Sequence, residues 1–200
     1  MLNTETNYAV LQGIISSAPR YSHKTYGEDF FEVILSVERK SGYCDKIRLM
    51  FSDRLLWEEN LEIGRNIRVE GQIRTYNEEQ DGKSHLNIVV FAKKIEILDE
   101  ICSENYISLS GFICKPTIRR SSPLGREICD IMLAVNRMYG KSDYIPCIAW
   151  GRNAAYAGRM DVGEKLNIIG RLQSREYKKK LDDDEIVEKT AYEVSILKIE

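Results

Sequence analysis

The chain has 200 residues, of which 43% are hydrophobic, and a formal net charge of −2. This length and composition allow two modest hydrophobic cores, each the size of a common small domain, and no stretch approaches the eighteen apolar residues of a membrane-spanning helix. The near-balanced charge excludes long-range attraction as the basis of nucleic-acid binding, so such a site would depend on where individual basic residues lie.

In chain order, the first hundred residues read mostly as strands. Apolar and β-branched runs at residues 8–16, 30–37 and 46–51 predict three strands. A short helix of two to three turns is expected next, because apolar residues follow the cap-like Ser52 and Asp53. Residues 67–76 and 86–98 predict two further strands joined by a charged hairpin.

The second hundred residues repeat this order. Residues 13–37 align with 111–135, and residues 51–71 align with 150–170, so the offset between the copies is 98 before the middle of each copy and 99 after it. In this alignment Phe51 matches Trp150, and Asp45 stands opposite Tyr144. A repeat of about a hundred residues indicates a duplicated domain rather than a solenoid.

Three strands, one helix and two strands in each copy predict a partly open five-stranded Greek-key barrel, the OB-fold. The expected architecture is all-β with one short helix per domain: OB-fold domain 1 at residues 1–98, a linker at 99–105, and OB-fold domain 2 at 106–200. The copies differ in charge. Residues 1–102 hold 13 Lys and Arg against 17 Asp and Glu, a net −4, whereas residues 103–200 hold 16 against 14, a net +2.

The five cysteines are odd in number and form no C-x-x-C pair, which favours buried, reduced thiols over disulfides or zinc. The two histidines, His23 and His85, have no cysteine or carboxylate at metal-binding spacing, and we expect both at the surface with no metal or cofactor. The N-terminus lacks the basic and apolar parts of an export signal. These features predict a cytoplasmic protein without membrane attachment.

Several pieces of the second copy occur together in register: Gly111, Pro123-Leu-Gly125, Leu133-Ala-Val-Asn-Arg137, Cys147-Ile-Ala-Trp150-Gly, Gly163-Glu-Lys-Leu and Gly170-Arg-Leu-Gln-Ser-Arg-Glu-Tyr177. With them, residues 106–199 resemble the bacterial single-stranded DNA-binding protein family, and copy one resembles it more faintly. The resemblance implies an OB barrel, DNA binding without sequence specificity, and an oligomer that presents four barrels. Two tandem chains supply four, so a homodimer is expected. The family's acidic C-terminal tip, which recruits partner proteins, has no counterpart at residues 197–200.

Residues suited to single-stranded DNA are also present, because such binding needs aromatic faces for bases and cations for phosphates. Tyr144 and Trp150 are six apart on one predicted strand and should share a face. Tyr177 ends the next strand, and the resemblance implies that all three aromatics stack on bases. The expected cations of copy two are Arg137, Arg175 and Lys178. In copy one, Phe51, Arg74, Tyr76 and Arg39 inherit the corresponding positions.

Each choice has a structural alternative. Trp150 alternates with Ile148 as a core residue would, and the lysines at 178–180 precede the acidic run 182–185, as in a solvated hairpin. Trp57 lies in the predicted helix and is expected to pack on the barrel. Copy one, with its negative charge and Asp45 opposite Tyr144, should bind DNA more weakly than copy two.

The expected function is therefore non-sequence-specific single-stranded DNA binding that supports replication, recombination or repair. An enzyme is not expected, since the sequence lacks a carboxylate cluster for metal, a Walker loop and a Ser/His/Asp set. The alternative is an OB-fold interaction module of a replication or primosome assembly, which the acidic first copy favours.

Overall fold

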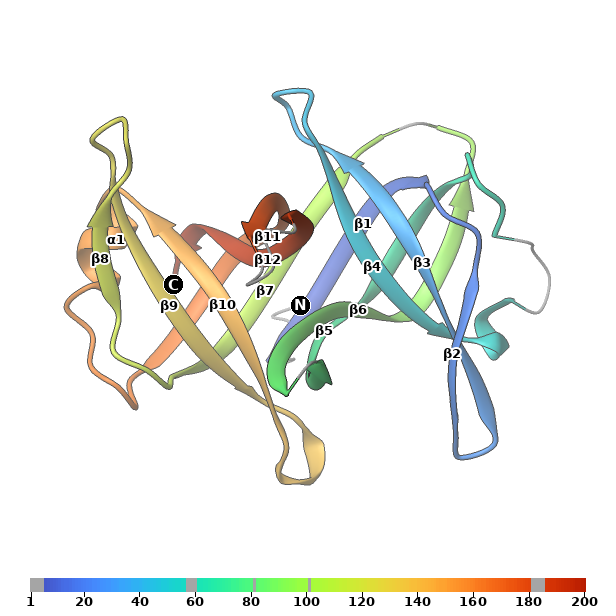
Figure 1. Ribbon diagram of the computed structural model, residues 1–200, viewed down its shortest axis with the longest axis horizontal. Helices are drawn as coiled ribbons and strands as arrows, with labels where there is room; N and C mark the ends of the chain where they lie inside the picture. Colours follow the sequence, from blue (N-terminus) through green and yellow to red (C-terminus); the bar gives the residue numbers. More distant parts are fainter. Residues whose placement is uncertain (1–5, 57–60, 81, 101, 181–185) are drawn as a thin grey trace.

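The computed structural model describes residues 6–56, 61–80, 82–100, 102–180 and 186–200 (Figure 1). Trp57 and the acidic run 182–185 lie outside these residues. Copy one contains the elements β1 (Asn7–Ile15), β2 (Arg20–Thr25), β3 (Glu28–Glu38), β4 (Cys44–Ser52), the 3-10 turn η1 (Asp53–Leu56), β5 (Asn66–Gln80) and β6 (Lys83–Leu98). Copy two contains β7 (Glu104–Ile113), β8 (Ile118–Ser121), β9 (Glu127–Asn136), η2 (Met138–Gly140), β10 (Ser142–Trp150), α1 (Arg152–Ala157), β11 (Lys165–Lys180) and β12 (Ile186–Ile199).

Each copy closes into a five-stranded barrel. In copy one, β1 pairs with β3 and β5, β3 with β4, β4 with β6 in parallel, and β6 with β5. Strands β7, β9, β10, β12 and β11 repeat this circuit in copy two. Alternating apolar residues of the strands fill each barrel, as the period of two requires. The predicted pair of tandem OB-folds is confirmed.

Two details differ from the prediction. A further strand, β2 in copy one and β8 in copy two, pairs with the following strand as a hairpin arm. All residues of both arms are exposed, so they carry no hydrophobic pattern from which a strand could be predicted. The expected helix is present in copy two as α1, whereas the described part of copy one has only the 3-10 turn η1 at that place.

The two barrels are joined edge to edge. Strand β1 pairs with β7 in antiparallel register, from Asn7 opposite Leu109 to Gln12 opposite Glu104. The pairing merges both barrels into one twelve-stranded sheet, with β1 and β7 side by side in its middle (Figure 1). Because equivalent strands run antiparallel at the junction, the copies are related by an approximate two-fold axis.

The strand register corrects the alignment of the copies. Leu35 pairs with Ile47 and Leu133 with Ile145, so the offset of 98 continues through β4 and β10. Phe30 pairs with Ser52 as Ile128 pairs with Trp150. The extra residue of copy two therefore lies after these strands. Three equivalences follow: Asp45 with Asp143, Lys46 with Tyr144, and Ser52 with Trp150. The pairings of Asp45 with Tyr144 and of Phe51 with Trp150 were wrong.

The cysteines are free thiols in differing surroundings. Cys129 and Cys147 are buried, as expected, but Cys44 and Cys102 are exposed, which corrects the expectation that all would be buried. Burial raises the pKa of the Cys147 thiol far above its ordinary value. Among the described residues, no helix has the length and apolar character needed to cross a membrane.

Candidate nucleic-acid interface

A hollow of about 670 Å³, called groove two here, lies on the outer face of barrel two. Its floor contains Ile128, Ile148 and Trp150 from the neighbouring strands β9 and β10. Trp150 is 38% exposed and lines this hollow. Five arginines line the same hollow: Arg39, Arg120, Arg126, Arg171 and Arg175. Arg120 also donates two hydrogen bonds to Asp130. One carboxylate, Glu193, is also part of the lining.

A larger hollow of about 1360 Å³, called groove one here, occupies the equivalent face of barrel one. Its lining includes the predicted residues Arg74, Tyr76 and Arg137. Lys93 and Lys141 add two further cations, and Glu78 is the acidic residue of the lining. Both grooves are therefore basic although the chain as a whole is slightly acidic, so cations are concentrated on the two faces that OB-folds use for ligands.

Both grooves contain apolar residues, but they differ in what strands β6 and β12 contribute. Phe30, Met50 and Val89 form an apolar cluster against which Phe91 packs, and Met50, Val89 and Phe91 line groove one. The strand register places Glu193 and Ser195 of β12 where β6 has Val89 and Phe91. Groove two thus has polar residues of β12 beside the exposed Trp150, whereas β6 contributes apolar residues to groove one.

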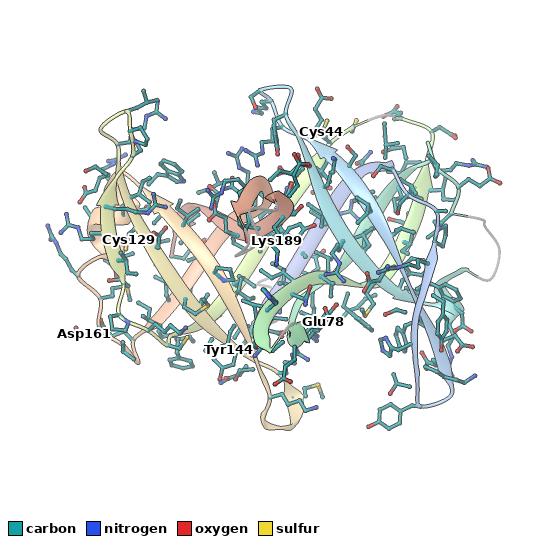
Figure 2. The ribbon with its side chains drawn as sticks, in the orientation of Figure 1. Cys44, Glu78, Cys129, Tyr144, Asp161 and Lys189 are labelled. Carbon is teal, nitrogen blue, oxygen red and sulfur yellow. The ribbon has the colours of Figure 1, made fainter. Side chains whose placement is uncertain are left out.

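The aromatic residues predicted in copy two lie at the surface. Tyr144 is 49% exposed and shares the outer face of β10 with Trp150, as the even spacing predicted. Figure 2 shows Tyr144 at the lower end of β10, where its backbone N–H donates to Oγ1 of Thr75 at 2.9 Å. Tyr144 and Tyr177 are exposed but line neither groove, so Trp150 is the predicted copy-two aromatic that meets the arginines.

Phe51 is a correction. Its side chain is fully buried in the core of barrel one, and its equivalent in β10 is the buried Ala149, not Trp150. Copy one has Lys46 at the position of Tyr144 and Ser52 at that of Trp150. The ammonium of Lys46 pairs with Glu176 at 3.0 Å. Arg175 is exposed in groove two, and Lys178 belongs to β11 with its side chain outside the description.

Asp45 does not face a ligand either. It is fully buried and accepts two hydrogen bonds from Arg39, from Nε at 2.7 Å and from Nη2 at 2.6 Å. Its Oδ1 also accepts the backbone N–H of Ser174, in the other barrel, at 2.7 Å. Nη2 of Arg39 donates in addition to the Ser174 carbonyl at 3.3 Å. The hydrogen bond to Asp45 raises the pKa of the Arg39 guanidinium.

The approximate two-fold axis repeats this cluster. Asp143, also fully buried, accepts Nε of Arg137 at 2.6 Å together with Nη2, and it accepts the backbone N–H of Thr75 at 2.6 Å. Arg137 donates to the Thr75 carbonyl at 2.9 Å. Arg74 joins the cluster, 3.2 Å from Asp143. One buried carboxylate of each barrel thus accepts a hydrogen bond from the backbone of the other barrel. These contacts hold the two barrels together.

Sequence reasoning missed three arginines of groove two: Arg120, Arg126 and Arg171. The first two belong to the β8 arm and its turn, which the prediction left without structure. Arg171 directly follows Gly170 on a predicted strand, so its presence on that strand was predictable. The alternation of side chains along a strand does not predict which part of the barrel surface forms a groove. Among the described residues, no three His, Cys, Asp or Glu side chains gather as metal ligands would.

Comparison with known proteins agrees with this geometry. The sequence model of the Single-strand binding protein family matches residues 104–200. The single-stranded DNA-binding protein of Thermus aquaticus is 27% identical over 166 residues, covering 73% of this chain and 63% of that protein. The one from Clostridium tetani is 32% identical over 83 residues, covering 38% of this chain and 57% of that protein.

The crystal structure of the wild-type Thermus aquaticus protein has the same fold, with a TM-score of 0.77 and 24% identity over 97% of this chain and 91% of that chain. The chain spans about three fifths of the length of the curated relatives it matches. Fold and grooves together define a tandem OB-fold protein with two basic outer faces. The family model matches its second barrel, which confirms the resemblance to single-strand binding proteins drawn from its sequence.

Proposed function

We propose that this protein binds single-stranded DNA without reading its sequence, and that groove two is its principal site. The observation that carries the proposal is the partly exposed Trp150 in a hollow that five arginines also line. An aromatic face accepts any base, and cations along a groove accept phosphates whatever the sequence. The names of the Thermus and Clostridium relatives support the same ligand.

Titration with a dye-labelled oligothymidine tests this proposal. We expect affinity that falls steeply as NaCl rises, because each phosphate neutralised on a single strand contributes a slope of about −0.7 in log K against log salt. A matched duplex of the same length should bind more weakly, since its bases are not free to stack. Failure to bind oligothymidine at low salt would remove the proposal.

A second candidate is protein binding by copy one. The apolar residues Met50, Val89 and Phe91 in the lining of groove one favour it, because such a surface suits apolar side chains of a partner as well as bases. Oligothymidine affinity of groove-one variants separates the two functions. Unchanged affinity would remove groove one from the DNA site and leave protein binding as its candidate role.

We also propose that two chains associate, so that the assembly presents four barrels. The duplication motivates this, since a covalent link between two barrels replaces one contact between subunits. Light scattering at tens of micromolar should give about twice the 23.1 kDa mass of the chain. A mass of one chain at that concentration would contradict the proposal.

A further inference from the structure

We infer that each groove is completed by an arginine of the other copy: Arg39 of barrel one supplies a phosphate contact in groove two, and Arg137 of barrel two supplies one in groove one. The inference rests on the proposed function and adds to it a division of each site between the two halves of the chain. Asp45 and Asp143 are then positioning residues, because they act on the ligand only through these arginines.

The first step is the location of Arg39. It follows β3 of barrel one, yet it lines groove two together with Trp150 and Arg175 of barrel two. Arg137 follows β9 of barrel two and lines groove one together with Arg74 and Tyr76. The exchange is reciprocal, as the approximate two-fold axis between the barrels requires.

The second step is the orientation of the guanidinium. Arg39 presents Nε and Nη2 to Asp45, and Nη2 also donates to the carbonyl of Ser174. Arg137 uses the same two atoms on Asp143 and Thr75. Within the part of the chain that the structure describes, Nη1 of neither arginine makes a hydrogen bond. Each guanidinium therefore keeps the two N–H donors of Nη1 for a ligand.

The third step is preorganisation. Side chains of Arg39 and Asp45 are 22% and 0% exposed, so the ion pair is held largely away from water. A long side chain that is already fixed loses less conformational entropy when a phosphate binds, and the planar guanidinium suits phosphate oxygens. Since Ser174 belongs to barrel two, the same contacts that dock the barrels also place Arg39 in the groove.

A purely structural ion pair is the competing account, and salt dependence distinguishes the two. We would measure oligothymidine binding to the full chain, to Arg39→Ala and to Lys40→Ala across a NaCl series. Lys40 is exposed, carries the same charge one residue away and does not line the groove. Arg39→Ala should lose affinity by about tenfold, the effect of one charge-assisted hydrogen bond. It should also lower the salt slope by about 0.7, the contribution of one phosphate.

Asp45→Asn tests the positioning role. The substitution makes the chain more positive by one charge, so charge alone would tighten DNA binding. The inference predicts weaker binding, because an amide holds the guanidinium less firmly than a carboxylate does. Thermal melts of each variant establish that the protein measured is folded.

Arg39→Lys keeps the positive charge and an ion pair with Asp45, so it replaces Arg39→Ala in the binding measurement if the alanine variant does not fold. An ammonium lacks the planar guanidinium that can hydrogen-bond a carboxylate on one side and a phosphate on the other. Affinity should therefore still fall. Parent-like affinity of Arg39→Lys, an unchanged salt slope in folded Arg39→Ala, or tighter binding by Asp45→Asn would each overturn the inference while leaving the proposed function intact. Absence of binding by the parent chain would instead remove the function itself and this inference with it.

Discussion

Phe51 illustrates how one residue of register decides between a core and a ligand surface. Its ring is fully buried and stacks against Phe31 at 6.2 Å between centroids. Phe51→Ala should lower the free energy of unfolding by about 3–5 kcal/mol, the usual cost of removing a buried phenyl group. Urea denaturation measures this loss. Trp150→Ala, at a half-exposed position, is the control and should cost much less stability. Parent-like stability of Phe51→Ala would contradict the assigned packing.

The cysteines give a second prediction at this scale. Iodoacetamide at pH 8 should modify Cys44 and Cys102, which are exposed, well before Cys129 and Cys147, which are buried. Reaction requires the thiolate, and burial raises the pKa of Cys147, so its thiol stays protonated at this pH. Peptide mass spectrometry identifies the modified sites, and labelling in urea provides the fully reactive control. Equal rates for the two exposed and the two buried thiols in the native protein would contradict the burial pattern.

At the scale of elements, a β-bulge shifts the register of the two longest strands of each barrel. The extra residue is Lys93 in β6, opposite the step from Glu70 to Gly71, and Leu197 in β12, opposite the step from Ile169 to Gly170. A Cβ atom on Gly71 would lie 2.2 Å from the carbonyl oxygen of Phe91, and one on Gly170 would lie 2.5 Å from that of Ser195. Backbone carbonyls of a paired strand cannot move aside cheaply, so both glycines permit the close approach of neighbouring strands.

Gly71→Ala should therefore destabilise the protein by about 1–3 kcal/mol, as forced overpacking does. The neighbouring and partly exposed Gln72 offers a control, since Gln72→Ala introduces no such contact. Denaturant unfolding of both variants provides the comparison. The bulge would lose its assigned role if the two substitutions had equal effects.

The elements also show which parts of the fold were predictable. Strands such as β1 and β9 have continuous apolar patterns, and the repeat made the OB-fold evident. The arms β2 and β8 were missed because all of their residues are exposed. The position of the extra residue was predicted wrongly because the identities shared between residues 51–71 and 150–170 lie after strands β4 and β10. They establish the offset of 99 there, but not the offset within the strands. The alternation within β4, where Ile47 and Leu49 face inward, decides the offset before it.

At the scale of the whole molecule, the two barrels form one cooperative unit. Strands β1 and β7 continue a single sheet, and two buried ion clusters cross between the barrels. If one barrel unfolded alone, the buried carboxylate of the other barrel would lose the backbone N–H donor that the unfolded barrel supplies. Such a loss is costly for a buried charge. We therefore expect a single unfolding transition.

The two tryptophans make this measurable, since Trp57 belongs to copy one and Trp150 to copy two. Trp57→Phe leaves Trp150 of barrel two as the fluorophore, and Trp150→Phe leaves Trp57, which follows η1 in the sequence of copy one. Fluorescence transitions of the two variants in urea should coincide with each other and with the circular dichroism transition. Each substitution can itself shift the unfolding midpoint, and circular dichroism of the same variant measures that shift. Fluorescence midpoints that still differ after this shift is subtracted would show that the barrels unfold independently.

The whole molecule also explains why the candidate site was only partly predictable. Trp150, Arg175 and Arg39 were each named from the sequence, but Arg39 was assigned to copy one's own surface. Its place in groove two depends on how the barrels dock, and no pattern within one copy contains that information. The buried role of Asp45 was hidden for the same reason, because its contact Ser174 is 129 residues away in the chain.

The most direct test of the account is the affinity of Trp150→Ala for oligothymidine, measured by anisotropy of a dye-labelled strand beside Tyr156→Ala. Tyr156 is 57% exposed on the same barrel but lines neither groove. Loss of one stacked base should cost Trp150→Ala about 1–3 kcal/mol of binding free energy, while Tyr156→Ala binds as the parent does. Equal losses from both substitutions, or parent-like affinity of Trp150→Ala, would contradict groove two as the site of single-stranded DNA binding.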